Sequence, residues 1–281
     1  MKEQNCEQKS CNHDCSSCGG SCGSNESANS VKAELNAHSK VKKVIGVVSG
    51  KGGVGKSMVT ALSAVAAAKN GYKVGVLDAD ITGPSIPKMF GVHQKCVGSE
   101  IGILPAVTEN NIKLMSINLL LDNEADPVVW RGPIIGGIVE QFWTDVFWDD
   151  LDVMFIDMPP GTGDVSLTVF QSLPIDGIVV VTSPQDLVSM IVRKAVNMAN
   201  MMGVDVLGLV ENFSYIECPD CGKKIELFGK SHAEDISSAS GIRLLEKLPV
   251  NPKLAEFADE GKIELSDGKE MTSIIELLKN I

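Results

Sequence analysis

The sequence predicts an α/β fold, in which a mostly parallel β-sheet carries helices on both faces and follows a flexible, cysteine-rich tail. After residue 40, short apolar runs alternate with longer helical stretches, and the apolar runs are not interrupted by polar residues. Strands of this kind are buried on both faces, as in parallel sheets. No aliphatic or aromatic residue occurs between Met1 and Ala28. We therefore expect a tail over residues 1–40 and one α/β domain over residues 41–281.

The elements follow in order from residue 42. KKVIGVVSG (42–50) predicts a β-branched strand that ends in glycine, and SMVTALSAVAAAKNG (57–71) predicts an alanine-rich helix that closes at Gly71. Further strands are predicted at 72–80, 153–160, 176–184 and 204–212, with an edge strand at 244–250. Further helices are predicted at 133–148, 164–173, 184–202 and 272–281.

Composition and charge limit the possible functions. The 281 residues are 44% hydrophobic and 22% charged, which allows a sizeable core. The net charge of −11 repels polyanions, so we expect neither nucleic acid nor an anionic membrane as a partner. No apolar stretch approaches the roughly 18 residues of a membrane helix. We expect a cytoplasmic protein, in which eight cysteines indicate metal ligands or reactive thiols rather than disulfides.

Residues 50–57 read GKGGVGKS, a phosphate-binding loop placed between a predicted strand and a predicted helix. Its glycines let backbone N–H groups turn toward phosphate oxygens, and the helix N-terminus adds partial positive charge. Lys56 is expected to reach the terminal phosphates, and the Ser57 hydroxyl to bind Mg²⁺. The expected nucleotide-binding residues of the loop are Gly50, Lys51, Gly52, Gly53, Val54, Gly55, Lys56 and Ser57.

Lys51 is a second lysine within this loop. It cannot easily reach the same phosphates as Lys56, because its side chain projects from the outer edge of the loop. One interpretation is a solvated surface lysine. The other is that a second subunit docks face to face, so that Lys51 neutralises transition-state charge in trans, as an arginine finger does.

Polar side chains end several of the predicted strands. Asp157 follows the apolar run VMFI, where a Walker B carboxylate holds Mg²⁺ or its water. Asp80 is predicted to orient the attacking water. Asp78 is expected either as an ordinary strand-end residue or as a contact of a Mg²⁺-bound water. Asn212 ends the strand at 204–212, where its amide either reads adenine or forms a turn.

Cys218 and Cys221 form a C-x-x-C motif in a predicted exposed loop. Two thiolates cannot complete the four-ligand shell of zinc or of a 4Fe-4S cluster. Either other residues join them, or two chains each contribute one pair across a twofold axis. The dimer that would bring Lys51 across would also build this site, so a bridging cluster is the preferred interpretation and zinc the alternative.

The tail carries a second group of cysteines, and Cys96 is expected to be a plain free thiol. Four tail thiolates are spaced closely enough to converge on a metal without a preformed fold. Thiolates suit iron-sulfur clusters and zinc alike, so the spacing does not name the metal, and a tail that binds metal only adventitiously is the alternative. The candidate ligands are Cys11, Cys15, Cys18 and Cys22, with Cys6 and His13 as substitutes.

The motifs GKGGVGKS, LDADITGPS, FIDMPPGTGD and VENFSYIECPDCGKKIELFG occur in this order and resemble the Mrp/ApbC (Nbp-type) family of iron-sulfur cluster carrier ATPases over about residues 40–280. That family belongs to the deviant Walker A class of P-loop NTPases, with MinD, ParA and the nitrogenase iron protein. The resemblance implies a homodimer that slowly hydrolyses ATP, holds a 4Fe-4S cluster between its subunits and delivers it to apo iron-sulfur proteins. It implies that Cys218 and Cys221 are the bridging ligands, Lys51 the signature lysine and residues 52–57 the nucleotide cradle.

Two other functions share parts of this pattern. A MinD/ParA-like positioning ATPase would share the phosphate loop, but normally needs a basic amphipathic tail or basic patch, whereas TSIIELLKNI carries one lysine against one glutamate. A zinc-stabilised nucleotide-binding regulator would share the loop and the cysteine pair without useful turnover. The metal bound by anaerobically purified protein would distinguish this regulator from a cluster carrier.

Overall fold

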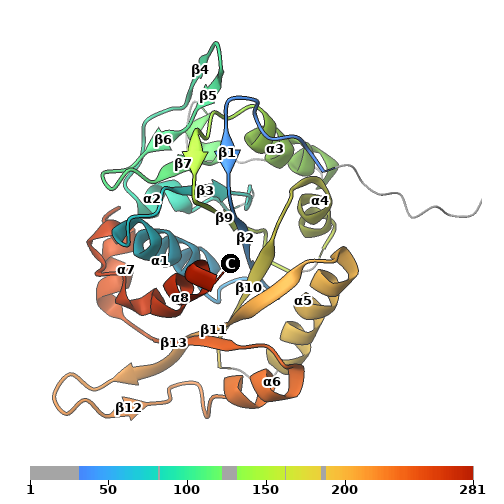
Figure 1. The fold of residues 1–281 in the computed structure, drawn as a ribbon. Helices are drawn as coiled ribbons and strands as arrows, with labels where there is room; N and C mark the ends of the chain where they lie inside the picture. The colour runs from blue at the N-terminus through green and yellow to red at the C-terminus, as the bar shows by residue number, and fades with distance from the viewer. Residues whose placement is uncertain (1–31, 82, 122–131, 162, 185–187, 281) are drawn as a thin grey trace, which may run out of the picture. The chain divides into compact units, whose positions relative to one another are not determined.

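A β-sheet forms the centre of the fold, with nine strands among the residues that the structure describes (Figure 1). The computed structural model describes residues 32–81, 83–121, 132–161, 163–184 and 188–280. The strand order is β12-β11-β10-β2-β9-β3-β7-β6, and β13 also pairs with β11. These strands are β2 (Val44–Ser49), β3 (Val74–Asp78), β6 (Ala106–Val107), β7 (Lys113–Met115), β9 (Val153–Asp157), β10 (Gly177–Thr182), β11 (Asp205–Glu217), β12 (Lys224–Ile225) and β13 (Leu244–Pro249).

The strand pairs of this sheet are parallel except β6–β7 and β11–β12, which lie toward its two edges. The predicted mostly parallel sheet is therefore confirmed. Outside this sheet, β1 (Lys40–Val41) pairs with β8 (Asp150–Leu151), and β4 (Val97–Ser99) pairs with β5 (Gly102–Leu104).

Helices cover both faces of the sheet (Figure 1). One face packs against α3 (Gly132–Thr144), α4 (Asp164–Ser172), α5 (Val188–Met202) and α6 (Ala233–Ser240). The other packs against α1 (Lys56–Lys69), α2 (Ile86–Met89), α7 (Pro252–Asp259) and α8 (Thr272–Asn280). Three 3₁₀ turns complete the described elements, η1 (Ile117–Leu119), η2 (Ile263–Leu265) and η3 (Lys269–Met271).

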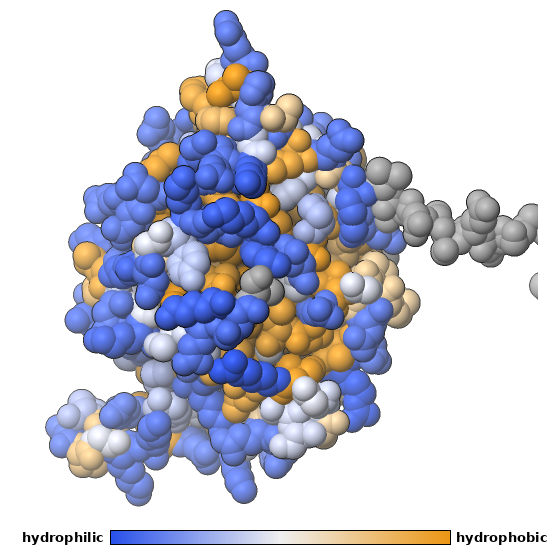
Figure 2. Space-filling view, in the orientation of Figure 1, coloured by the Kyte–Doolittle hydropathy of each residue, from blue (hydrophilic) through white to orange (hydrophobic). Residues whose placement is uncertain are grey.

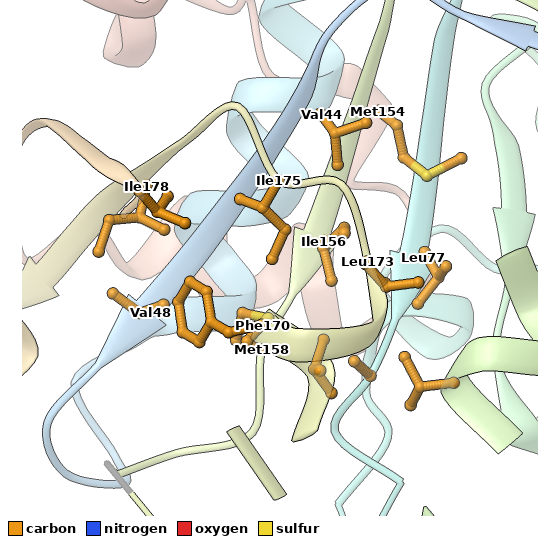
Figure 3. Close-up of a cluster of buried hydrophobic side chains, with 14 of the residues drawn as sticks. Val44, Val48, Leu77, Met154, Ile156, Met158, Phe170, Leu173, Ile175 and Ile178 are labelled. Carbon is orange, nitrogen blue, oxygen red and sulfur yellow. The ribbon is translucent and has the colours of Figure 1, made fainter. Parts of the chain in front are cut away.

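The sheet is covered on both faces because its strands are apolar on both. In β2, Val44 and Val48 belong to one core, whereas Ile45 and Val47 belong to the other. This alternation follows from the two-residue period of a strand. Figure 3 shows part of the first core, in which Phe170 of α4 packs with strand residues.

The predicted elements are found, with differences at their ends. The helix predicted over 133–148 ends at Thr144, because Val146 instead forms a β-bridge with Ile103. The strand predicted to end at Asn212 continues to Glu217, because its last residues pair with β12. The helix predicted from 184 is described from Val188. The short elements β4 to β7, α2, α6 and α7 were not predicted.

The chain contacts this domain before residue 40. The Ala33 N–H donates to the Ser172 carbonyl at 2.8 Å, and Trp143 Nε1 donates to the Ala33 carbonyl at 3.1 Å. Ala33 and Leu35 also pack against the first core. Within the part of the chain that the structure describes, no helix has the length and apolarity needed to cross a bilayer.

The carboxyl ends of the parallel strands meet at one edge of the sheet, which is where open α/β sheets bind ligands. The phosphate loop follows β2 there, Asp78 ends β3, and Asp157 ends β9. The strand order places β9 directly between β2 and β3. The fold therefore brings the predicted nucleotide-binding residues to one place.

Candidate functional site

The phosphate loop, residues 50–55, connects β2 to α1. Gly53 and Gly55 have φ angles of 78° and 79°, which residues with a Cβ rarely adopt. Gly55 is the N-cap residue of α1 and has no side chain with which to cap it. The first N–H groups of any helix have no partner within the helix, and in α1 no N-cap side chain accepts from them. This end of α1 is therefore suited to an anion.

Lys56, the first residue of α1, is buried. Its Nζ lies 2.7 Å from Oδ1 of Asp157 and 3.7 Å from Oδ2 of Asp80. A buried charge is tolerated only when it is paired. The carboxylates therefore hold the Lys56 ammonium at the place where nucleotide phosphates are expected.

Asp157 is fully buried and accepts two hydrogen bonds from α1. Ser57 Oγ donates to Oδ2 at 2.6 Å, and Thr60 Oγ1 donates to Oδ1 at 2.9 Å. The structure thus joins the hydroxyl and the carboxylate that were predicted to bind Mg²⁺. Thr60 was not predicted, although it lies four residues after Lys56 and therefore on the same face of the helix.

Asp78 is the register partner of Asp157 on the neighbouring parallel strand and is also fully buried. Ser116 Oγ donates to its Oδ2 at 3.1 Å, and the Asp80 N–H donates to its Oδ1 at 3.2 Å. Burial raises the pKa of Asp78 to about 8, and the negative charge of Asp157 acts in the same direction. At neutral pH, Asp78 is therefore mainly protonated. Ser116 was not predicted.

Asp80 and Lys51 lie where the site is less buried. The Asp80 side chain is 13% exposed, compared with 0% for Asp157. Lys51 is half-buried within the phosphate loop. Asp80 needs solvent access if it orients water, and Lys51 needs it if it contacts a second subunit. Both roles stay predictions.

Asn212 of β11 lies against the phosphate loop. Its Nδ2 donates to the Val54 carbonyl at 3.0 Å, and its Oδ1 accepts from the Phe213 N–H at 2.9 Å. A Cβ on Gly55 would lie 2.2 Å from Asn212 Nδ2, so a larger residue does not fit there. Phe213 has a φ of 59°, an uncommon value for a residue with a side chain. Asn212 thus supports the loop, and its reading of adenine stays a prediction.

The C-x-x-C motif occupies the exposed turn between β11 and β12. The Cys218 N–H donates to the Lys223 carbonyl at 3.0 Å, and the Gly222 N–H donates to the Cys218 carbonyl at 2.9 Å. Gly222 has a φ of 68°, which its lack of a Cβ permits. Cys221 is exposed and Cys218 is half-buried. The turn therefore presents both thiols close to solvent.

The thiol of Cys218 in this turn and the thiol of Cys96 outside it differ in the direction of their pKa shifts. Hydrogen bonds from the backbone at Asp220 and Cys221 lower the pKa of the Cys218 thiol. A lowered pKa favours the thiolate, which is the metal-binding form. Burial instead raises the pKa of Cys96, whose Sγ lies 3.7 Å from Met115 Sδ.

In the described part of the chain, the two thiols of the turn lack a further metal ligand close by. Among the residues that the structure describes, no group of three or more His, Cys, Asp or Glu side chains could hold a metal ion. A four-ligand centre at Cys218 and Cys221 would thus need ligands from elsewhere. The candidate tail ligands Cys6, Cys11, His13, Cys15, Cys18 and Cys22 lie outside the described residues.

One strand connects the phosphate loop to the cysteine pair. Asn212 contacts the loop, and β11 ends at Glu217, directly before Cys218. The six residues from Asn212 to Cys218 span at most about 20 Å when extended. Between them, the buried Ser214 hydroxyl donates to the buried Glu211 carboxylate. This connection was not predicted, because the strand was expected to end at Asn212.

Comparisons with known proteins agree with the site. The family described as "ParA: NUBPL iron-transfer P-loop NTPase" matches residues 40–281. An "Iron-sulfur cluster carrier protein" from Clostridium perfringens is 50% identical over 246 residues, which cover 84% of this chain and 86% of that protein. A protein of the same name from Methanocaldococcus jannaschii is 44% identical, with 86% and 85% covered.

Solved structures show the same fold. A nucleotide-binding protein from Archaeoglobus fulgidus in complex with ADP has a TM-score of 0.74 and 43% identity, covering 81% of this chain and 89% of that chain. The MinC:MinD complex from Aquifex aeolicus has a TM-score of 0.59 and 20% identity, covering 85% and 95%, and supports the fold alone. With the family match over residues 40–281 and relatives at 50% and 44% identity, this chain belongs to the NUBPL iron-transfer family of P-loop NTPases.

Proposed function

We propose that this chain is an iron-sulfur cluster carrier, a homodimeric ATPase that holds a 4Fe-4S cluster between its subunits and passes it to apo iron-sulfur proteins. Its relatives from Clostridium perfringens and Methanocaldococcus jannaschii carry the name of such a carrier. The observation that supports this proposal best is the strand β11, which contacts the phosphate loop at Asn212 and ends beside Cys218.

The cluster is the cargo of this proposed reaction, and the cysteine turn would hold it. Cys218 and Cys221 supply two thiolates, whereas a 4Fe-4S cluster takes four ligands. Because no third ligand lies near the turn in the described part of the chain, a second copy would contribute the missing pair. The exposure of the turn would then allow an apo-protein to reach the cluster.

The nucleotide would bind at the N-terminus of α1, with its phosphates against the loop. The oxygen donors of Ser57 and Asp157 fit Mg²⁺, a hard cation. When bound with ATP, Mg²⁺ supplies positive charge that stabilises the phosphate oxygens. Lys56, paired with Asp157 in this structure, would contact phosphate instead.

Hydrolysis would be slow and would use the more exposed acidic residue of the site. Asp80 would orient a water whose oxygen bonds to the γ-phosphorus, while the bond from that phosphorus to the bridging oxygen breaks. The proton released by the water would pass to Asp80 or to solvent. Lys51 would stabilise the charge that develops at the nucleotide of the second subunit.

Anaerobic reconstitution with iron and sulfide tests the cluster site. The parent is a full-length variant in which the five tail cysteines are serine, so that only the turn can contribute paired thiols. We expect about two irons per chain, or one cluster per dimer, and loss of this iron in Cys218→Ala, Cys221→Ala. Undiminished iron in the double variant would refute the assignment. Zinc at half an equivalent per chain, without iron, would favour the regulator instead.

Lys56→Ala tests the role of the nucleotide. Cluster binding should survive, because the thiol ligands lie elsewhere, whereas delivery to apo-proteins in cells should fail. Both quantities can be measured on the same variant, as iron content and as the activity of a client enzyme. Client activity equal to that of the wild type would show that nucleotide is dispensable.

A further inference from the structure

The β11–β12 hairpin carries exposed apolar side chains next to its cysteines. Ile225, Leu227 and Phe228 are 48%, 55% and 49% exposed. The hairpin projects from the sheet at the lower left of Figure 1, and Figure 2 shows hydrophobic atoms among hydrophilic ones there. Single exposed apolar residues are ordinary, but three within four consecutive positions form a patch that suggests a partner.

This patch begins close to the ligands of the proposed cluster. Cys218 and Lys223 face each other across the hairpin, joined by the 3.0 Å hydrogen bond between their backbones. Ile225 is two residues beyond Lys223, about 7 Å along an extended chain. Leu227 and Phe228 follow it. Ile225 pairs with Ile216, two residues before Cys218, so a chain that shares a cluster with Cys218 would come close to the start of this patch.

The charge of the hairpin favours a second copy of this chain as that partner. The whole chain carries a net charge of −11, so two copies repel each other over most of their surfaces. Residues 217–230 instead balance three acidic side chains against three basic ones, Glu217, Asp220 and Glu226 against Lys223, Lys224 and Lys230. The segment is therefore neutral overall, so two copies of it do not repel each other as the rest of the chain does.

We propose that Ile225, Leu227 and Phe228 form an apolar seam, which contacts the same three residues of a second copy around the shared cluster. The seam rests on the proposed function, because it is the four-ligand cluster that requires the second copy. Its contacts would oppose separation of the two hairpins. They would also exclude water from the side of the cluster that the cysteines leave uncovered.

The test compares Leu227→Ser, Phe228→Ser with Val107→Ser after anaerobic reconstitution. Val107 is a matched control, because it is 53% exposed and lies on β6, at the opposite end of the sheet order from β12. Sedimentation equilibrium should show a dimer dissociation constant at least tenfold higher in the seam variant than in the wild type or in Val107→Ser. At low protein concentration, an iron chelator should also remove iron about tenfold faster from the seam variant.

A second variant keeps the apolar residues and changes the charge. Lys223→Glu, Lys224→Glu makes the hairpin acidic and should weaken the dimer, and added salt should reverse this effect by screening the repulsion. Circular dichroism would confirm that each variant is folded. A dimer that is equally stable in the wild type and in both variants would overturn the seam.

The experiment separates failure of the seam from failure of the cluster site. If the wild type loads a cluster at Cys218 and Cys221 and the seam variant dimerises normally, the seam is wrong and the carrier function stands. Slower transfer to an apo-ferredoxin with an unchanged dimer would also overturn the seam, since the patch would then meet a client. If the wild type loads no iron at these cysteines, the cluster site fails and the seam with it.

Discussion

Asn212 Nδ2 donates to the Val54 carbonyl at 3.0 Å, and this hydrogen bond ties β11 to the phosphate loop. Both residues are buried, where a lost hydrogen bond is costly, so Asn212 stabilises this conformation of the loop. The close packing extends to the next residue, because a Cβ on Gly55 would lie 2.2 Å from the same Nδ2. The nucleotide loop and the strand that leads to Cys218 therefore pack as one unit.

The first prediction concerns the glycines of this loop. Gly55→Ala should reduce ATP affinity at least a hundredfold, because its Cβ would displace Asn212 and because the φ of 79° disfavours alanine. Gly98→Ala is the control, since a Cβ there would meet nothing within 4 Å and Gly98 lies in β4, outside the phosphate loop. Its affinity should stay within a few-fold of the wild type. Titration with a fluorescent ATP analogue measures both, and equal affinities in the two variants would contradict the packing argument.

The second prediction concerns stability without nucleotide. Lys56→Ala leaves Asp157 buried without its cation, which should cost about 3–5 kcal/mol of unfolding free energy. The double variant Lys56→Ala, Asp157→Asn should lose less unfolding free energy than the two single variants lose in sum, because the second substitution removes the unpaired charge. Urea unfolding of the single and double variants measures this coupling. Additive costs would show that the 2.7 Å pair contributes nothing.

The third prediction follows from the raised pKa of Asp78. The folded chain keeps this carboxyl protonated up to about pH 8, whereas the unfolded chain ionises it above about pH 4. Since the folded state binds more protons in this window, the contribution of Asp78 to stability falls as pH rises from about 4 to about 8. Asp78→Asn has no such proton, so its stability relative to the wild type should rise across the window and level off above it.

Urea unfolding between about pH 5 and pH 9 measures this difference. Asp149→Asn is the control, because hydrogen bonding to Lys113 lowers the pKa of Asp149, and its contribution changes only at more acidic pH. Its stability difference from the wild type should be constant over the measured range. A constant difference for Asp78→Asn as well would mean that Asp78 is ionised in the folded chain.

Local spacing was enough to predict part of the site. Residues 50–57 form one continuous motif, and Asp157 ends a recognisable strand, so both could be identified before any contact was known. Ser116 could not, because its bond to Asp78 depends on how a segment 38 residues further along the chain returns to β3. The contact between Asn212 and Val54 joins residues 158 positions apart. Such contacts follow from strand order, which the sequence pattern does not specify.

The fold, like the site, contains elements that could be predicted from the sequence and elements that could not. The long parallel strands were predicted because continuous apolar runs mark burial on both faces. The extension of β11 to Glu217 was missed because SYIE is not continuously apolar and is held by pairing with β12, which has only two residues. That extension is what carries the strand from the phosphate loop to the cysteine turn.

The last prediction concerns the order in which thiols react. The pKa of Cys218 is lowered by backbone hydrogen bonds and that of Cys96 is raised by burial, so Cys218 holds more thiolate near neutral pH. Because thiolate is the nucleophile, iodoacetamide should alkylate Cys218 at least tenfold faster than Cys96 at about pH 7.5. Peptide mass spectrometry after short pulses resolves these two residues from the tail cysteines.

The same experiment with Mg²⁺ and ATP tests whether β11 transmits binding. Nucleotide at the loop should change the alkylation rate of Cys218, since Asn212 and Cys218 belong to one continuous stretch of chain. The rate at Cys96 should not change, because this thiol lies directly before β4, on a different segment. Gly55→Ala should abolish the nucleotide effect by weakening ATP binding. A Cys218 rate that is insensitive to ATP in the wild type would show that the strand joins the two sites without coupling them.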